Sequence, residues 1–168
     1  MTRIHSFAPI ARNDARVLIL GSVPGVQSLQ MQQYYAHPRN AFWEIIGGLC
    51  GATRDLPYDQ RLEHLQSSGI AVWDVLHSAE REGSLDSAIR LAVPNDLEGL
   101  LETCPAIELI ALNGSYAAAT FKRYAPALIA KLRVVTLPST SPAHARMGVQ
   151  QKLGIWCDAL EPVLLKGA

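Results

Sequence analysis

The sequence is poor in cysteine, and its few cysteines form no motif. Only three of the 168 residues are cysteines, namely Cys50, Cys104 and Cys157, and no two of them form a Cys-x-x-Cys pair. An odd number of widely spaced cysteines excludes a disulfide framework and gives no support to a zinc or iron–sulfur site. The five histidines show no metal-ligand spacing either. We therefore expect free thiols in a reducing compartment, no metal and no cofactor.

Long hydrophobic runs are also absent. No stretch approaches the roughly 18 consecutive apolar residues that a membrane-spanning helix needs, and residues 1–9 lack the apolar segment of a signal peptide. The hydrophobic content of 49% is nevertheless enough to bury one core. The sequence therefore predicts a single domain over residues 1–168, in a soluble, cytoplasmic, monomeric protein that does not contact membranes.

The chain has no excess charge of either sign. Its 15 basic residues balance 15 acidic ones, so the molecule as a whole creates no attractive field for a polyanion. Any contact with nucleic acid must then come from a local group of basic side chains.

What the sequence does contain is an alternation of apolar runs with segments of helical spacing. Strands are expected at Val17–Leu20, Ile70–Val72, Ile107–Leu112 and Val134–Leu137. Helices are expected at Ala41–Leu49, Tyr58–Gln66, Leu97–Glu102, Ser115–Tyr124 and Val149–Leu165. This order is typical of an α/β fold and predicts a three-layer α/β/α sandwich around a four-stranded, mostly parallel sheet. Ligands of such sheets bind beyond the carboxyl ends of the strands, so the residues that follow each strand are the first candidates for a site.

The first expected strand is followed by the segment Gly21-Ser22-Val23-Pro24-Gly25. Two glycines around a proline make a tight turn, and a phosphate or a sugar can approach its backbone closely. The segment is neither a P-loop nor a G-x-S-x-G nucleophile elbow. An ordinary strand-to-helix turn explains it at least as well when it is taken alone.

Residues 34–43 combine four aromatic rings with a histidine, an arginine and an asparagine. The segment is Tyr34-Tyr35-Ala36-His37-Pro38-Arg39-Asn40-Ala41-Phe42-Trp43. Aromatic faces stack on bases, Arg39 suits a phosphate, and the Asn40 amide can hold a water or a base edge because it both donates and accepts hydrogen bonds. Alternatively, Asn40 is the N-cap of an amphipathic helix, which leaves His37 and Arg39 unexplained.

A polar loop follows the last expected strand. It is Leu137-Pro138-Ser139-Thr140-Ser141-Pro142-Ala143-His144-Ala145-Arg146. Hydroxyl groups and backbone amides hold phosphates in register, and His144 and Arg146 supply local positive charge. The alternative is a solvated, proline-rich connection that leads into the last helix.

Taken together, G-S-V-P-G, Y-Y-A-H-P-R-N-A-F-W and L-P-S-T-S-P-A-H-A resemble the signature motifs of the uracil-DNA glycosylase superfamily. The match is closest to its hypoxanthine-DNA glycosylase branch, and A-H-P-R-N-A-F-W is also similar to a stretch of the mismatch-specific uracil glycosylases. The motifs lie in the right order over nearly the whole chain. The resemblance implies an enzyme that flips the target nucleotide out of DNA and reads its base in a pocket.

The resemblance also implies a role for each motif. Gly21, Ser22 and Val23 would contact the base, and Phe42 would stack on it. The contacts to DNA would come from Pro24, Gly25, His37, Arg39, Ser139, Thr140, Ser141, Pro142, His144 and Arg146. The loop of residues 139–145 would press on the backbone and enter the minor groove.

One position departs from the family pattern. Many members carry Asp or Asn at the third position of the first motif to position the attacking water, and this chain has Val23 there. The hypoxanthine branch is similar in lacking that polar residue, and its equivalent of Asn40 is thought to serve catalysis. We therefore expect Asn40 to orient the water, since an oxocarbenium-like transition state needs no strong base.

Trp73 and Asp74 follow the second expected strand, where the superfamily's base-reading side chain lies. Trp73 is expected beside the base, and Asp74 is a second catalytic candidate because its carboxylate can accept a hydrogen bond from a ring N–H or polarise water. The alternative for Asp74 is a helix N-cap. Ser84, Asp86 and Ser87 resemble a further recurring stretch of the branch, and they equally fit a capping pattern.

The hypothesis from the sequence is a monofunctional glycosylase that hydrolyses the N-glycosidic bond of hypoxanthine, and also of uracil or xanthine, in DNA. No Schiff-base lyase activity is expected, because the lysines lie in no recognised motif. They are Lys122, Lys131, Lys152 and Lys166. The pair Val23 and Asn40 favours this branch over a uracil-specific enzyme. A catalytically silent nucleic-acid-binding domain and a hydrolase of free nucleosides are the further alternatives.

Overall fold

The computed structural model describes residues 2–165, so Lys166 lies outside the described residues. Its main sheet has four strands in the order β3-β2-β6-β7. They are β2 (Val17–Gly21), β3 (Ile70–Asp74), β6 (Leu109–Asn113) and β7 (Arg133–Leu137). All three pairings are parallel, with Val17 opposite both Ile70 and Leu109. The parallel sheet expected from the sequence is confirmed.

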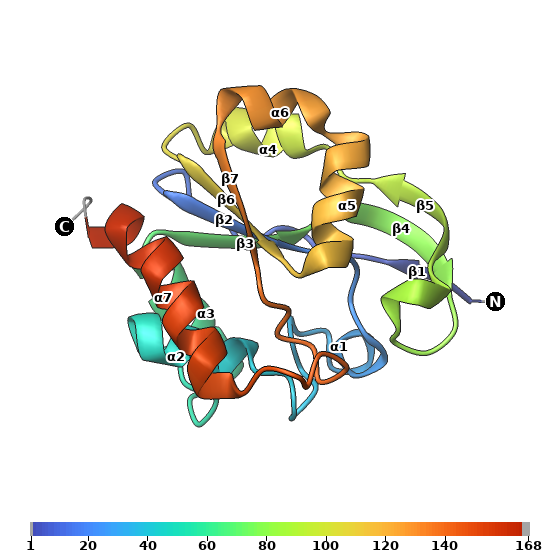
Figure 1. Cartoon of the computed structure of the whole chain (residues 1–168), viewed down its shortest axis with the longest axis horizontal. Coiled ribbons are helices and arrows are strands. Elements are labelled where there is room, and N and C mark those ends of the chain that lie inside the picture. The colour runs from blue at the N-terminus through green and yellow to red at the C-terminus, as the bar shows by residue number, and fades with distance from the viewer. Residues whose placement is uncertain (1, 166–168) are drawn as a thin grey trace.

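Helices cover both faces of this sheet (Figure 1). On one side lie α2 (Phe42–Cys50), α3 (Tyr58–Ser67) and α7 (Val149–Leu165), and on the other lie α4 (Leu97–Thr103), α5 (Ser115–Tyr124) and α6 (Pro126–Lys131). The three-layer sandwich is therefore confirmed. The helices α6 and α1 (Val26–Met31) were not predicted, because six residues are too few to show a helical period.

Each face of the sheet has its own hydrophobic core, which the alternation of side chains along β2 explains. Leu18 and Leu20 point into one core with Phe121 of α5, whereas Val17 and Ile19 point into the other with the helices α2 and α7. All four β2 side chains are fully buried. Since burial of such a side chain stabilises the fold by roughly 1.5–3 kcal/mol, β2 anchors the sheet from both sides.

A second sheet was not expected from the sequence. It is antiparallel, in the order β1-β4-β5, and consists of β1 (Thr2–His5), β4 (Leu76–Arg81) and β5 (Arg90–Pro94), with a 3₁₀-helix, η1 (Asp86–Ala88), between β4 and β5. Its strands mix polar with apolar residues and lack a continuous apolar run, so the hydrophobic pattern of the sequence does not predict them. Because β3 continues through Val75 directly into β4, Asp74 caps no helix, and that alternative is wrong.

Within residues 2–165, no helix is long and apolar enough to cross a membrane. The loop after β7 and the helix α1 meet at the lower end of the molecule in Figure 1, where the carboxyl ends of the parallel strands lie. The chemistry expected for this fold belongs at that end.

Candidate active site

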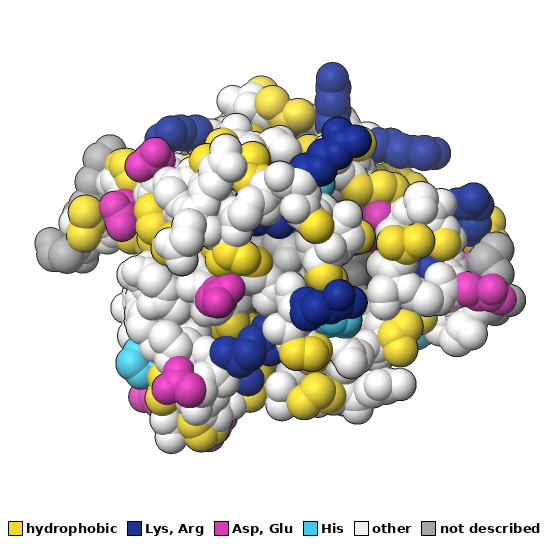
Figure 2. Space-filling model, turned by 60° about the horizontal axis from the view of Figure 1, so that its bottom comes forward, with side chains coloured by type: hydrophobic (Ala, Val, Ile, Leu, Met, Phe, Trp, Pro, Cys, Tyr) yellow, Lys and Arg dark blue, Asp and Glu magenta, His cyan; other side chains and the backbone are white. Residues whose placement is uncertain are grey.

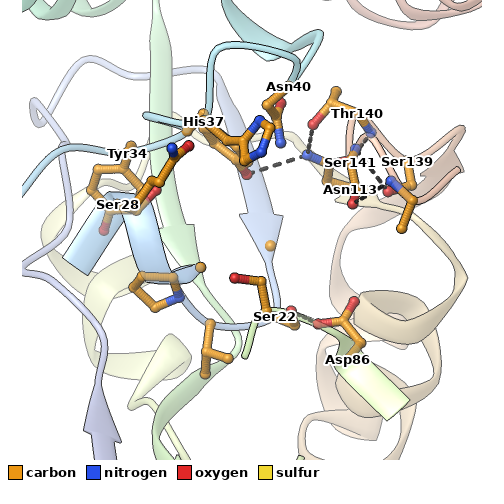
Figure 3. A pocket seen from close by; sticks show the side chains of 18 of the residues that line it. Ser22, Ser28, Tyr34, His37, Asn40, Asp86, Asn113, Ser139, Thr140 and Ser141 are labelled. Atoms are coloured by element: carbon orange, nitrogen blue, oxygen red, sulfur yellow. Dashed lines mark hydrogen bonds between the residues drawn. The ribbon is translucent and has the colours of Figure 1, made fainter. Parts of the chain in front are cut away.

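A cavity of about 440 Å³ lies at the carboxyl ends of the parallel strands. Its walls come from segments that are far apart in the sequence: the loop after β2, the segment ahead of α2, the ends of β3 and β6, the stretch before η1 and the loop after β7 (Figure 3). The fold thus brings together the two loops that the sequence analysis singled out.

All five residues of the first loop, 21–25, line the cavity. Gly21 ends β2, and a Cβ atom there would lie 2.7 Å from Oδ1 of Asp74 and 3.1 Å from Oη of Tyr35. Only glycine lets the strand end approach both groups so closely. The side chain of Val23 is buried and has no polar atom, so this side chain cannot hold a water.

The first loop is held in place by the stretch that leads into η1. The Ser22 hydroxyl donates a 2.6 Å hydrogen bond to Asp86 (Figure 3). The Ser84 hydroxyl accepts one of 2.9 Å from the backbone N–H of Val26. The buried guanidinium of Arg81 donates to the carbonyl oxygen of Pro24. Ser84 and Asp86 therefore position the loop, whereas Ser87 does not line the cavity.

Asp74 places a buried carboxylate at the wall of the cavity. The residue is 4% exposed, and its Oδ2 atom has no hydrogen-bond partner among the described residues. Burial, followed by repulsion from Asp86, raises its pKa from 3.8 to about 7, against the opposing attraction of Arg81. A buried acceptor without a partner in the protein is available to a donor on a ligand.

Asn40 lies at the rim of the cavity, directly before α2. The N-cap of α2 is Ala41 and not Asn40, as the alternative reading of the sequence had it. The Asn40 side chain nevertheless contacts the start of the helix, because its Oδ1 accepts a 2.9 Å hydrogen bond from the backbone N–H of Phe42. The Asn40 amide nitrogen makes no hydrogen bond to the described part of the chain. The side chain is thus held by its oxygen and has a free donor.

Arg54 organises the backbone around Asn40. Its Nη2 atom lies within hydrogen-bond distance of the carbonyl oxygens of Tyr35, His37 and Asn40, at 3.5, 3.2 and 3.1 Å. One guanidinium thus ties together three carbonyl groups of the segment before α2. His37 also lines the cavity, whereas Arg39 is exposed and does not.

The two aromatic residues expected to contact the base do not line the cavity. Phe42 is fully buried, and its ring is stacked on that of Tyr35 with centroids 3.9 Å apart. Trp73 is half-buried and donates through Nε1 to the carbonyl oxygen of Phe7. Side chains of a strand alternate in direction, so the pleat that brings Asp74 to the cavity takes Trp73 away from it.

The loop after β7 contributes Ser139, Thr140, Ser141 and Pro142 to the cavity. Thr140 is buried, and its backbone N–H and hydroxyl are both bound by the Asn113 amide at 3.0 Å (Figure 3). The Ser139 and Ser141 hydroxyls accept hydrogen bonds from nearby amides of the same loop. His144 and Arg146 are exposed and lie outside the cavity lining, on the part of the loop that faces solvent.

Comparison with known proteins decides the family. The family model of the uracil DNA glycosylase superfamily matches residues 9–160. The chain belongs to this superfamily. It is 37% identical over 144 residues to a protein of Methanosarcina acetivorans named hypoxanthine DNA glycosylase, covering 84% of this chain and 89% of the relative. It is 34% identical over 159 residues to a Methanosarcina barkeri protein of the same name, covering 94% of this chain and 98% of the relative.

A solved structure supports the same assignment. The solution NMR structure of a protein described as a uracil DNA glycosylase from Methanosarcina acetivorans is similar to this chain with a TM-score of 0.82 and 33% identity. The match covers 96% of this chain and 99% of that protein. The similarity therefore extends over the main sheet and the loops around the cavity.

Asn113 and Tyr35 are two of the cavity residues that were not predicted as site residues from the sequence. Asn113 ends β6 and binds both Tyr35 and Thr140, and Tyr35 lines the cavity next to Asp74. The rule that sites follow strand ends would have selected Asn113, since it directly follows an expected strand. For Tyr35 no such signal exists, because only the fold decides which of several adjacent rings faces the cavity.

Proposed function

We propose that this protein is a monofunctional DNA glycosylase that hydrolyses the N-glycosidic bond of hypoxanthine in DNA, with uracil and xanthine as further substrates. The observation that carries the proposal is the buried, unpartnered carboxylate of Asp74 in a cavity at the strand ends. The names of the two Methanosarcina relatives point to the same activity.

The carboxylate of Asp74 suits the bases that deamination creates. Hypoxanthine carries an N–H group at the ring position where adenine has a bare nitrogen, and uracil differs from cytosine in the same way. An ionised carboxylate accepts a hydrogen bond from that N–H, whereas it would face the lone pair of the undamaged base. Leaving a buried acceptor unpaired costs binding energy, so Asp74 discriminates against adenine and cytosine.

We assign to Asn40 the role of orienting the attacking water. Bond breaking sends the electron pair of the C1′–N bond to the departing base and leaves an oxocarbenium-like sugar. A water then attacks C1′, and the proton that it loses neutralises the departing base anion. Asn40 is held by its contact to the backbone N–H of Phe42, and its free amide hydrogens can fix the position of that water. It orients the water rather than acting as a strong base.

The cavity holds no nucleophile for a lyase reaction. Its lining residues include no lysine, and the Nζ of Lys152 donates a 2.8 Å hydrogen bond to the carbonyl oxygen of His144. The proposed enzyme therefore leaves an abasic site with an intact strand.

DNA would approach the end of the molecule that faces the viewer in Figure 2. On this face, Lys and Arg side chains lie at several separate places rather than in one continuous patch. The exposed residues Arg39, His144 and Arg146 are the proposed contacts of the phosphates, and the serine-rich loop between positions 139 and 143 is the proposed contact of the duplex next to the flipped base.

The test is single-turnover base release from duplex oligonucleotides with one hypoxanthine, uracil, xanthine or adenine, without added metal and with alkali afterwards to cleave abasic sites. We expect release of hypoxanthine and strand breaks only after alkali, with no release of adenine. Release of uracil alone would mean that uracil, and not hypoxanthine, is the substrate. Binding without any abasic product would favour a silent binding domain, and cleavage of free inosine would favour a nucleoside hydrolase.

A further inference from the structure

A buried guanidinium lies behind the first loop, outside the cavity. Arg81, the last residue of β4, is 2% exposed and does not line the cavity. Its Nε donates a 2.8 Å hydrogen bond to the carbonyl oxygen of Gly83, and its Nη2 donates to that of Pro24. Both partners are neutral carbonyl groups, which satisfy the hydrogen bonds but do not balance the charge. A buried cation of this kind requires a negative charge nearby.

Two carboxylates lie against the same loop. Asp74 approaches Gly21 closely, since a Cβ atom on Gly21 would lie 2.7 Å from Oδ1 of Asp74. Asp86 accepts the 2.6 Å hydrogen bond of the Ser22 hydroxyl, and Figure 3 shows these two side chains pointing toward each other. Residues 21–24 therefore contact two anionic groups and the cation within one turn of the chain.

The three charged groups act on one another. Asp74 and Asp86 repel each other, and Arg81 attracts both. Burial and the repulsion from Asp86 raise the pKa of Asp74, whereas the attraction of Arg81 lowers it. Two neighbouring carboxylates ionise together in a buried site only where a cation offsets their repulsion. The arrangement thus depends on Arg81 for the charge of both acids.

The other titratable groups around Asp74 are Tyr34, Tyr35 and His37. Burial raises the pKa of both tyrosines, so both are neutral near pH 7. His37 lines the same cavity, and its Nδ1 accepts a hydrogen bond from a backbone N–H. A guanidinium stays protonated, so Arg81 supplies a permanent positive charge to the cluster.

We propose that Arg81 keeps Asp74 in the ionised form that accepts a hydrogen bond from the base, and that it thereby determines which bases the cavity reads at neutral pH. The inference rests on the proposed glycosylase function. Arg81 lies outside the cavity, so it is a positioning residue that acts through the charge of Asp74. A protonated Asp74 would present a donor, which opposes the N–H of hypoxanthine and suits the bare ring nitrogen of adenine.

The experiment measures the single-turnover rate of hypoxanthine release as a function of pH in the wild type and in Arg81→Gln, Arg81→Lys and Asp86→Asn. Glutamine keeps an N–H donor for the loop but lacks the charge, lysine keeps the charge, and asparagine keeps an acceptor for the Ser22 hydroxyl. The midpoint of the pH profile reports the charge around Asp74. The plateau of the profile reports the position of the first loop.

We expect Arg81→Gln to move the midpoint upward from about 7 by roughly one pH unit or more, and Asp86→Asn to move it downward. Arg81→Lys should keep the midpoint close to that of the wild type. His37→Asn should keep it as well, because the inflection belongs to Asp74. A purely structural role of Arg81 would lower the plateau in Arg81→Gln without moving the midpoint, and this result would overturn the proposal.

A double variant keeps the proposal testable if Arg81→Gln does not fold. Arg81→Gln combined with Asp86→Asn removes one cation and one anion together, so neither is left without its counter-charge. The midpoint of the double variant should lie above that of Asp86→Asn alone. Equal midpoints would overturn the proposal.

A second readout does not depend on activity. Carbon NMR of protein labelled at its aspartate carboxyl groups follows the ionisation of Asp74, whose signal is the one lost in Asp74→Asn. We expect the same upward shift in Arg81→Gln. If the wild type releases no base but this signal shifts, the proposed function fails and the electrostatic role of Arg81 stands. If base is released and neither midpoint moves, only the role of Arg81 fails.

Discussion

The guanidinium of Arg54 donates a hydrogen bond of 3.1 Å to the carbonyl oxygen of Asn40. Arg54 lies in the connection between α2 and α3, outside the motifs that resemble the family, and does not line the cavity. It is therefore a positioning residue, which acts on the reaction through the backbone of the segment before α2.

We predict that Arg54→Met lowers the maximal single-turnover rate by about 10-fold or more, because a displacement of roughly 1 Å of a catalytic group costs up to 10²-fold. The half-saturating enzyme concentration should change much less. Arg54→Lys retains a donor and should recover part of the rate. Arg12→Met, which removes an exposed arginine paired with Asp14, is the matched control. A wild-type maximal rate in Arg54→Met would rule out the positioning role.

Replacement of Asn40 tests the assignment of the water-orienting group. Asn40→Ala should lower the single-turnover rate by about 10²-fold or more, as loss of a transition-state contact does. It also removes the hydrogen bond to the Phe42 backbone, so a loss of stability of about 1 kcal/mol, typical of a lost cap, should accompany it. Asn13→Ala, at an exposed position, is the control. A rate equal to that of the wild type would withdraw Asn40 from the mechanism.

The raised pKa of Asp74 predicts the pH dependence of base release. Its pKa of about 7 results first from burial, second from repulsion by Asp86, and is opposed by Arg81. Because only the ionised carboxylate serves as a pure acceptor for the ring N–H, the rate should rise with pH through about 7. Asp74→Asn should lose both this inflection and most of the activity. A rate that falls over the same range would show that the protonated form is the active one.

The same pKa predicts how stability depends on pH. The folded state binds the proton of Asp74 more tightly than the unfolded chain does, whose value is 3.8. Between pH 4 and about pH 7 the folded state therefore holds more protons, and its free energy of unfolding should fall as the pH rises. Asp74→Asn should flatten this dependence, with a residual slope from Asp86, whose pKa is also raised by burial. Denaturant titrations at several pH values measure the free energy of unfolding. If its dependence on pH is the same in Asp74→Asn as in the wild type, the raised pKa does not belong to Asp74.

The exposed Arg146 in the loop after β7 leads to a prediction for the salt dependence of DNA binding. Arg146→Ala should weaken binding to any duplex and reduce the slope of log K against log salt by about 1, since one phosphate contact is lost. The rate at saturating enzyme should stay unchanged. Arg133→Ala is the control, because Arg133 is also exposed and starts β7 at the opposite end of the sheet. An unchanged salt slope would place DNA away from this loop.

Sequence patterns predicted the parts of the fold that depend on local periodicity. The strands of the parallel sheet and the longer helices were predicted to within a few residues, because their core-facing side chains recur at fixed intervals. The antiparallel sheet β1-β4-β5 escaped prediction, since its short strands mix buried with exposed positions. Its existence matters for the site, because β4 carries Arg81, whose guanidinium binds the first loop.

The sequence by itself determined the family and the segments that form the site, because motif residues and strand ends are local properties of the chain. Only the tertiary structure decided which side chain of each segment faces the cavity. Tyr35 faces it and Phe42 does not, because the packing of α2 against the sheet encloses one ring and leaves the other at the surface of the core. The same holds for Asp74, whose raised pKa arises from burial that no local pattern encodes.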